Sequence, residues 1–299
     1  MGRFRLRHTT RYQYSEPVAL SQNQLRLTPR NRGGQRLLRR RLAISPKPEE
    51  LTHRRDYYAN WVSHFDVYEP HEELIITSYA EVEVARPTID LKTDSPHWDA
   101  ISHQLKTDIT GNGLHRYQFT FASPLVPLLP VARDYAAKSF PKGRSILQAT
   151  FELIERIHQD FTYDPNATTV STPVAEVFEK KRGVCQDLAH VTLSCLRSIG
   201  LAASYVSGYV RTYSVQSQTE MVGADASHAW VSVFAGPLGW IDFDPTNRLV
   251  VRNEHIVLAI GRDYRDVCPV NGLFIGGGQQ KLTVSVQLKT DDAAAEQTL

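Results

Sequence analysis

Cys185 stands at the start of a predicted helix. Arg182-Gly183 forms a turn before it, and apolar residues then recur at helical spacing up to Gly200, a residue typical of a helix end. Unpaired N–H groups and the positive end of the helix dipole favour a thiolate at this place. The same N–H groups can bind an oxygen that becomes negative during acyl transfer. Cys185 is therefore a candidate nucleophile, although free cysteines in helices are often simply buried.

Two further residues supply the rest of an activated thiol site. His228 begins a short apolar segment of strand character, and Asp244 ends a second one after the turn at Gly236–Gly239. If the two strands pair as a hairpin, the histidine and the acid come together. The histidine can then take the thiol proton while the acid fixes the ring tautomer. Taken singly, His228 also fits a polar strand end and Asp244 a turn residue before proline.

The chain resembles the transglutaminase-like superfamily of papain-type thiol enzymes. The resemblance is carried by four motifs in order, Gly183-Val184-Cys185-Gln186-Asp187, Gly208-Tyr209-Val210, His228-Ala229-Trp230-Val231, and Gly239-Trp240 with Asp244-Pro245-Thr246-Asn247. It implies that Cys185 is the nucleophile, His228 the base and Asp244 the orienting acid. Asp242 lies on the same strand face as Asp244, so spacing alone does not choose between them.

The N-terminal part resembles the β-rich domain that precedes this core in bacterial relatives. The matching stretches are His8-Thr9-Thr10-Arg11-Tyr12-Gln13-Tyr14, Leu25-Arg26-Leu27-Thr28-Pro29 and Asp56-Tyr57-Tyr58-Ala59-Asn60. That pattern has a glycine before its asparagine, where this chain has Ala59. We therefore expect the turn there to differ.

These patterns predict an α+β protein, in which a papain-like transglutaminase core follows an antiparallel β-sandwich-like domain. In the core, a helix with the cysteine packs on an antiparallel sheet with the histidine and the acid. We expect an N-terminal β-rich domain over residues 1–85 and a connecting segment over 86–130. The catalytic core then covers 131–290, and 291–299 forms a disordered tail.

Composition is that of an ordinary globular chain of 299 residues, with 41% hydrophobic and 22% charged residues and a net charge of +2. No apolar run is long enough to span a membrane, and no signal peptide precedes the first alternating residues. Cys185, Cys195 and Cys268 are too few for a disulfide framework and lack zinc spacing. We therefore expect a cytoplasmic protein.

The first sixty residues are basic, with 14 Lys+Arg against 4 Asp+Glu. Such an excess raises the possibility of nucleic-acid binding. The arginines alternate with inward-facing aromatic and apolar residues such as Phe4, Leu6 and Tyr12, which places them on the outer face of strands. No nucleic-acid partner is expected, and docking to an acidic partner or to the core fits this face better.

The predicted chemistry is acyl transfer through a Cys185 thioester on a peptide or protein amide, without a metal or organic cofactor. The Cys185 N–H supplies one oxyanion donor, and Gln186 and Tyr163 are candidates for the second, with Trp230 as a further cleft residue. Hydrolysis is favoured, because the polar loop at 214–220 gives no sign of a dry channel for an amine. A crosslinking transglutaminase and a non-catalytic scaffold are the alternatives. His255 competes with His228 for the base but has no acid in the strand-pair arrangement.

Overall fold

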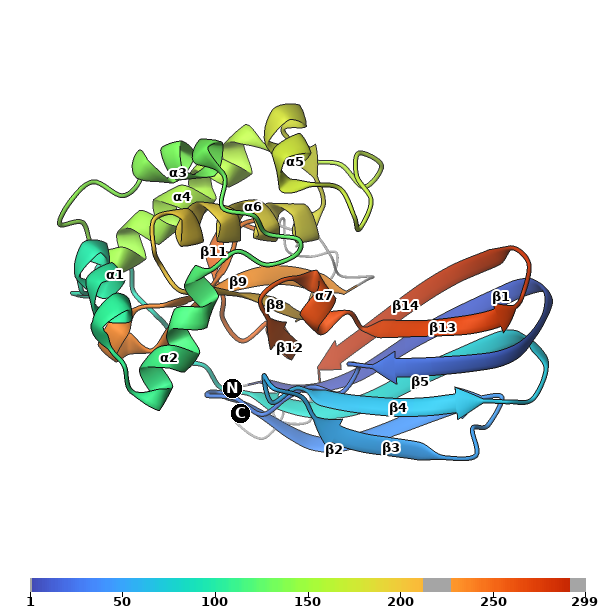
Figure 1. Ribbon diagram of the computed structural model, residues 1–299. Helices are drawn as coiled ribbons and strands as arrows, with labels where there is room; N and C mark the ends of the chain where they lie inside the picture. Colours follow the sequence, from blue (N-terminus) through green and yellow to red (C-terminus); the bar gives the residue numbers. More distant parts are fainter. Residues whose placement is uncertain (1, 212–226, 291–299) are drawn as a thin grey trace.

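The computed structural model describes residues 2–211 and 227–290. The chain forms two large antiparallel sheets, with helices packed on one of them (Figure 1). The first sheet is built mainly from the N-terminal strands, and the second carries the candidate site. This is the mixed α and β architecture that the sequence predicts.

The first sheet is organised around one very long strand, β1. It spans Gly2–Leu25, where alternating buried and exposed residues produce an inner and an outer face. The other N-terminal strands are β2 (Gln35–Ser45), β3 (Leu51–Arg55), β4 (Trp61–Val67) and β5 (His71–Val84). Their order is β2-β5-β1-β4-β3.

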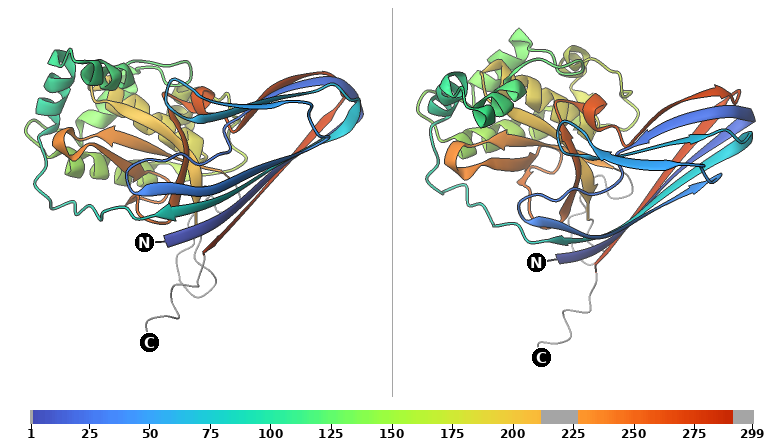
Figure 2. Two further views of the ribbon diagram at one scale, coloured as in Figure 1. Left: turned by 90° about the horizontal axis from the view of Figure 1, so that it is seen from below. Right: turned by 60° about the horizontal axis from the view of Figure 1, so that its bottom comes forward.

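The N-terminal strands form one curled sheet, where the sequence suggested a sandwich-like arrangement. The first half of β1 pairs with β5, and its second half pairs with β4. The strand thus runs through both halves of the sheet, which bends over a small core of its own (Figure 2). Val18, Leu25, Phe65 and Ile76 are buried in this core. Alternation alone predicted the strands but could not show that one strand serves both halves.

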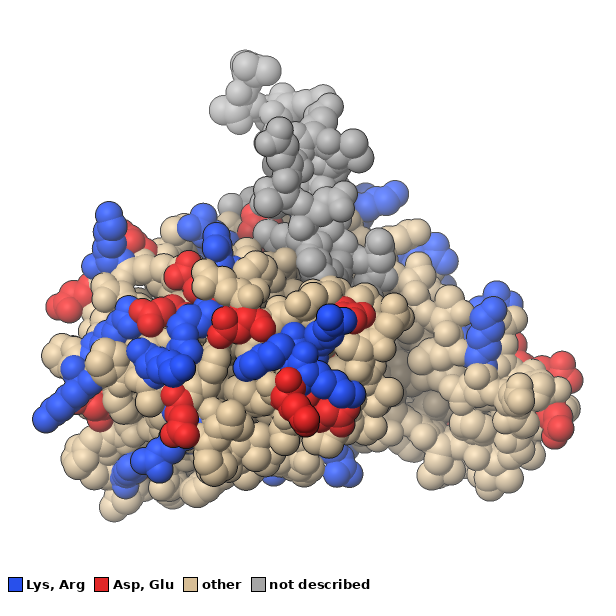
Figure 3. Space-filling model, turned by 90° about the horizontal axis from the view of Figure 1, so that it is seen from above, with Lys and Arg blue, Asp and Glu red and all other residues tan. Residues whose placement is uncertain are grey.

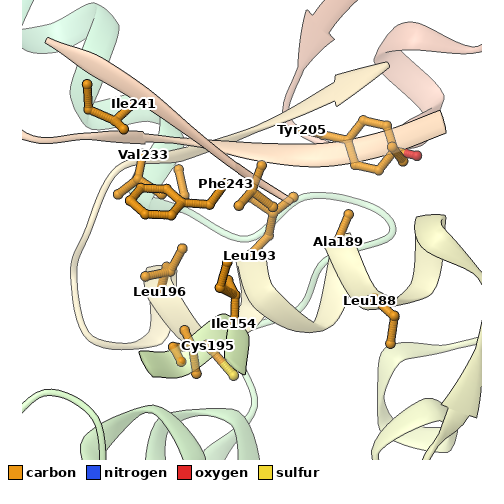
Figure 4. Packing of buried hydrophobic residues seen from close by; sticks show 14 of the residues in the cluster. Ile154, Leu188, Ala189, Leu193, Cys195, Leu196, Tyr205, Val233, Ile241 and Phe243 are labelled. Atoms are coloured by element: carbon orange, nitrogen blue, oxygen red, sulfur yellow. The ribbon is translucent and has the colours of Figure 1, made fainter. Parts of the chain in front are cut away.

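The second sheet has the order β11-β10-β9-β8-β12. Its strands are β8 (Ala203–Val210), β9 (His228–Phe234), β10 (Trp240–Asp244), β11 (Leu249–Val250) and β12 (His255–Gly261). The helices on this core are α3 (Pro130–Ala137), α4 (Ile146–Asp160), α5 (Val174–Lys180) and α6 (Cys185–Ser198), and the short α7 (Tyr264–Val267) follows β12. Leu193 and Leu196 of α6 face Val233 and Phe243 of the sheet (Figure 4). This apolar contact fixes the start of α6 relative to the strand ends.

Two segments differ from the predicted domain limits. Residues 86–130 contain α1 (Trp98–Thr107), α2 (Gly111–Tyr117) and the 3-10 turn η1 (Gln118–Thr120), and Ile101, Leu105 and Phe119 belong to the main hydrophobic core. Strands β13 (Val270–Gly276) and β14 (Gln280–Thr290) pair with β1 in the first sheet, although the prediction placed residues up to 290 in the catalytic core. Alternation marked Leu282 to Leu288 as a strand, but a single strand pattern does not identify its partner.

Side-chain amides join the two sheets. The amide of Gln35 donates to the Val257 carbonyl at 2.9 Å and accepts from its N–H at 2.8 Å. Asn60 makes the same two bonds with Ile260, at 2.8 and 2.9 Å. Both residues therefore satisfy backbone groups of β12, a strand at the edge of the second sheet. The N-terminal sheet also contributes Phe4, Leu6 and Val82 to the main core, so the two parts are held by both polar and apolar contacts.

Several N-terminal arginines form ion pairs within the first sheet. Arg3 lies 2.9 Å from Glu81, and Arg36 lies 2.7 Å from Glu83, both acids being on β5. On the face above the helices, basic and acidic side chains are interspersed (Figure 3). Much of the basic excess in the first sixty residues is thus matched by acids that come later in the chain.

Among the helices described here, none is both long and apolar enough to cross a membrane.

The turn at Ala59 is the basis of a stability prediction. Ala59 has φ = 59°, in the left-handed region that favours glycine. Because left-handed backbone is strained for alanine, Ala59→Gly should stabilise the protein by about 1 kcal/mol. Urea unfolding of the two proteins measures the difference. The matched control is Ala100→Gly in α1, where the same change should destabilise by about 1 kcal/mol, and a loss of stability in both variants would contradict strain at Ala59.

Candidate active site

The start of α6 is shaped by a carboxylate that reaches back over the turn. Asp187 Oδ2 accepts the Val184 N–H at 2.8 Å, which satisfies one of the unpaired groups at the helix start. A Cβ on Gly183 would come within 2.6 Å of that same oxygen. The sequence Gly183 to Asp187 therefore forms a tight turn that leaves Cys185 as the first residue of the helix and partly exposed.

An extended polar segment lies beside this turn and is tied to α6. Gln186 Nε2 donates to the Val170 carbonyl at 3.0 Å, and the Thr168 hydroxyl donates to Asp187 at 2.6 Å. Tyr163, on the short strand β6 (Thr162–Tyr163), pairs with Gly183 of β7 (Arg182–Gly183) and is 37% exposed. Burial and the nearby Cys185 raise the pKa of Tyr163. Tyr163 therefore lies next to the thiol, whereas the Gln186 amide group is used to hold the segment.

The Asp244 carboxylate is fully buried and accepts hydrogen bonds from two histidines and its own turn. Oδ2 accepts from His228 at 2.8 Å, from His255 at 3.0 Å and from the Asn247 amide at 2.7 Å. Oδ1 accepts the backbone N–H groups of Thr246 and Asn247, both at 3.0 Å. Burial would raise the pKa of Asp244, but the His228 charge and these bonds hold the pKa well below its usual range. Asp244 is therefore an anion that its surroundings stabilise.

The His228 ring is bonded to this anion, and Cys185 influences its pKa. Burial would lower the pKa of His228, but Asp244 and then Cys185 act against it, and the pKa is raised above its usual value of 6.5. Nε2 is bonded to Asp244, so Nδ1 is the nitrogen left for the thiol. Nδ1 is buried and makes no standard hydrogen bond within the described residues.

His255 is the residue that sequence reasoning undervalued. It lies on β12, on the far side of β8 from β9, and still reaches the same Asp244 oxygen as His228. Burial lowers the pKa of His255 despite the neighbouring carboxylate. A local strand pattern could not reveal this contact, because His255 is placed by the pairing of β12 with β8, a strand that comes much earlier in the chain. His255 therefore helps to hold Asp244, while His228 remains the histidine next to Cys185.

Trp230 and Asp242 belong to the support of the site. Trp230 is fully buried, with its ring 5.1 Å from that of His255 and its N–H donated to Asp242 at 3.1 Å. It does not line an open cleft, contrary to the expectation. A Cβ at Gly208 would come within 2.4 Å of the Trp230 ring, which explains the glycine in that motif. Asp242 binds Arg32 of the N-terminal part at 2.8 and 3.1 Å, so this acid joins the two parts and does not contact His228.

His228, Asp244 and His255 also have the donor types of a metal site, with their ligand atoms within 4.8 Å of one another. A tetrahedral zinc ion with bonds of about 2 Å would need its ligand atoms about 3.3 Å apart. The observed separations from Asp244 Oδ2 are 2.8 and 3.0 Å, which are hydrogen-bond distances. The geometry thus fits a hydrogen-bonded cluster better than a metal centre.

The polar loop at 214–220, used above to favour hydrolysis, lies outside the described residues.

Comparison with known proteins agrees with this geometry. Residues 4–83 match the family described as the bacterial transglutaminase-like N-terminal region, and residues 133–245 match the transglutaminase-like superfamily. Proteins of Mycobacterium bovis and Mycobacterium tuberculosis are 38% identical over 96% of this chain and 92% of their own length. A Mycobacterium leprae protein is 32% identical over 96% of this chain and 99% of its own. The chain belongs to the transglutaminase-like superfamily, in the bacterial group that carries this N-terminal region.

A solved structure shows the same fold over nearly the whole chain. It is a protein of Cytophaga hutchinsonii that is provisionally described as a cysteine protease. Its sequence is 20% identical to this chain. The superposition has a TM-score of 0.78 and covers 98% of this chain and 91% of the other. The match includes the curled N-terminal sheet as well as the catalytic core. The two parts therefore form a shared architecture.

The three cysteines differ in their surroundings, which predicts how they react. Cys195 is fully buried in the core, where burial raises the pKa of its thiol, whereas Cys185 is partly exposed beside His228. Iodoacetamide should therefore label Cys185 much faster than Cys195 and Cys268 in the folded protein. Peptide mass spectrometry after timed labelling measures the three rates. In His228→Ala the rate at Cys185 should fall toward that of Cys268, and equal labelling of all three in the wild type would count against an activated thiol.

Proposed function

We propose that this protein is a cysteine hydrolase that cleaves a peptide or amide bond through a thioester on Cys185. The proposal rests on the buried hydrogen bond between His228 and Asp244. Cys185 acts to raise the pKa of this same histidine. Membership of the transglutaminase-like superfamily supports the same roles, with Cys185 as nucleophile, His228 as acid and base, and Asp244 as orienting acid.

The reaction would begin with transfer of the thiol proton to His228 Nδ1. The thiolate attacks the amide carbonyl, and the tetrahedral intermediate collapses as His228 returns the proton to the leaving amine. A water molecule, deprotonated by His228, then attacks the thioester carbon, and the proton reaches the departing Cys185 sulfur. Throughout, Asp244 keeps Nε2 protonated and the ring in place, because its carboxylate is fixed by His255 and the Asp244–Asn247 turn.

The developing oxyanion would be bound at the start of α6. The first N–H groups of a helix have no partner within it, and Cys185 is the first residue of α6. Of the two candidates for a second donor, the Gln186 amide group is bonded to Val170. The Tyr163 hydroxyl is the better candidate, since this ring is partly exposed next to Cys185.

Hydrolysis is supported by the polar wall beside the thiol. Residues 164–172 carry several exposed polar side chains and are tied to α6 by Gln186 and Thr168. Such a wall gives water access to the thioester, whereas crosslinking requires an amine to arrive before water. The competing candidate, a crosslinking transglutaminase, shares the same acylation step and differs only in the acceptor.

The deciding experiment acylates the protein with an activated glutamine ester in the presence of a millimolar small primary amine. We expect free acid to exceed amide product, as measured by liquid chromatography and mass spectrometry. The Cys185→Ala protein is the control for uncatalysed reaction of the ester. Dominant amide product would make the protein a transglutaminase, and turnover equal to that of Cys185→Ala would favour the non-catalytic scaffold.

A pair of matched substitutions separates the two acids of β10. Asp244→Asn should reduce turnover by about 10⁴-fold, since the asparagine no longer fixes the His228 tautomer. Asp242→Asn should act mainly on stability, because Asp242 binds Arg32, Ser232 and Trp230 and does not contact His228. Turnover per folded molecule and unfolding midpoints should be measured for both variants. A larger loss of turnover in Asp242→Asn would move the orienting role to that residue.

The pH profile of acylation gives a second test of the same contact. Asp244 is the main influence that raises the pKa of His228 against burial, so the charged imidazole persists above pH 6.5. Without that carboxylate the pKa must fall, and the alkaline limit of acylation should move to lower pH in Asp244→Asn. Stopped-flow acylation between neutral and alkaline pH measures this limit. An unchanged limit would show that Asp244 does not control His228.

A further inference from the structure

A second concave site lies between the two parts of the protein, away from the thiol. It is a cavity of about 390 Å³, within the range of small-molecule sites. Its walls come from the loop at Arg30–Gly33, from Tyr58, from α2 and η1, and from the outer face of the second sheet. None of Cys185, His228 and Asp244 lines it. The proposed hydrolysis therefore leaves this cavity without a role.

Three aromatic rings from separate parts of the chain form an apolar wall of the cavity. Tyr58 packs on Phe119 with ring centroids 5.8 Å apart, and Phe119 packs edge-on against Trp240 at 5.4 Å. Phe119 is almost fully buried in the main core, so the neighbouring rings pack against a fixed support. The wall is thus formed before any ligand arrives, and it offers flat apolar surface.

Arg30 adds a positive charge to this wall, which Asp56 and Asp242 offset only from beyond ion-pair distance. Its Nη1 donates to the Tyr58 carbonyl at 3.0 Å and to the Asn60 side-chain oxygen at 2.8 Å, which are both neutral acceptors. Its Nε is buried without a hydrogen-bond partner, and no carboxylate of residues 2–211 and 227–290 forms an ion pair with it. Arg32, by contrast, is matched by Asp242 at 2.8 Å. A largely buried charge of this kind is costly unless a counter-ion pairs with it.

We propose that this cavity binds a small organic carboxylate with a flat apolar or aromatic body. A carboxylate is planar and singly charged, and it can accept from the Nη2 side of the Arg30 guanidinium. The apolar body of the ligand packs against Tyr58, Phe119 and Trp240. A phosphate ester would bring about two negative charges against the single unmatched cation. The site is separate from the thiol chemistry and stands whether or not Cys185 is catalytic.

The test uses phenylacetate as probe and phenylacetamide as its neutral counterpart of the same shape. Isothermal titration calorimetry on the full chain should show millimolar or tighter binding of phenylacetate, and binding of phenylacetamide weaker by about tenfold or more, because the amide cannot compensate the charge. Cys185→Ala protein serves as the host, which excludes any contribution from the thiol.

Two variants locate the binding and a third is the control. Arg30→Met should weaken phenylacetate binding by about tenfold or more and remove the preference over the amide. Gly33→Trp should block the cavity, and a Cβ there meets no atom within 4 Å, so this variant tests the site even if Arg30→Met fails to fold. Arg36→Met, at an exposed arginine paired with Glu83, should bind as the parent does. Equal affinity for acid and amide, no binding of either, or binding unaffected by Gly33→Trp would overturn the proposal.

Discussion

Burial of the Asp244 carboxylate is the constraint on which the site depends. An ionised acid without solvent is stable only when its lone pairs are satisfied, and here three side chains and two backbone N–H groups provide the bonds. This requirement holds together β9, β10 and β12, because His228 and His255 reach Asp244 from the other two strands. The bonds to Asp244 act to raise the pKa of both histidines, but they outweigh burial only at His228, where Cys185 adds to them, and burial keeps the pKa of His255 below its usual value. One buried charge thus fixes the ring position, its tautomer and its proton.

The neighbouring acid, Asp242, links that site to the rest of the molecule. It lies two residues before Asp244 and binds Trp230 and Ser232 on the core and Arg32 on the N-terminal part. Together with the Gln35 and Asn60 amides on β12, it holds the curled sheet against the strand carrying His255. The N-terminal part is therefore structural support for the active-site strands. The aromatic cavity with Arg30 forms where these two parts meet.

Residue types and their order in the chain predicted much of the site. Gly183, Cys185 and Asp187 define a turn and a helix start by local bonding, so the sequence alone predicts a cysteine at the start of a helix there. The hairpin of β9 and β10 follows from two apolar runs around a glycine turn, and it brings His228 to Asp244 as expected. Long-range sheet order is a different matter, since it rests on contacts between residues far apart in sequence. For that reason no local signal predicted that β13 and β14 pair with β1, or that the pairing of β12 with β8 places His255 in the site.

The sequence by itself determined the local chemistry, including the α+β class, the thiol at a helix start and the candidate histidine and acid. Tertiary structure decided which of two adjacent acids meets His228, because twist and turn geometry send Asp244 to the histidines and Asp242 to Arg32. It also decided that Trp230 is buried support and that one curled sheet replaces the expected sandwich. The physical reason is the range of the interactions. Helix caps and turns are satisfied within a few residues, whereas burial of charge and pairing of strand edges require partners that only the folded chain brings together.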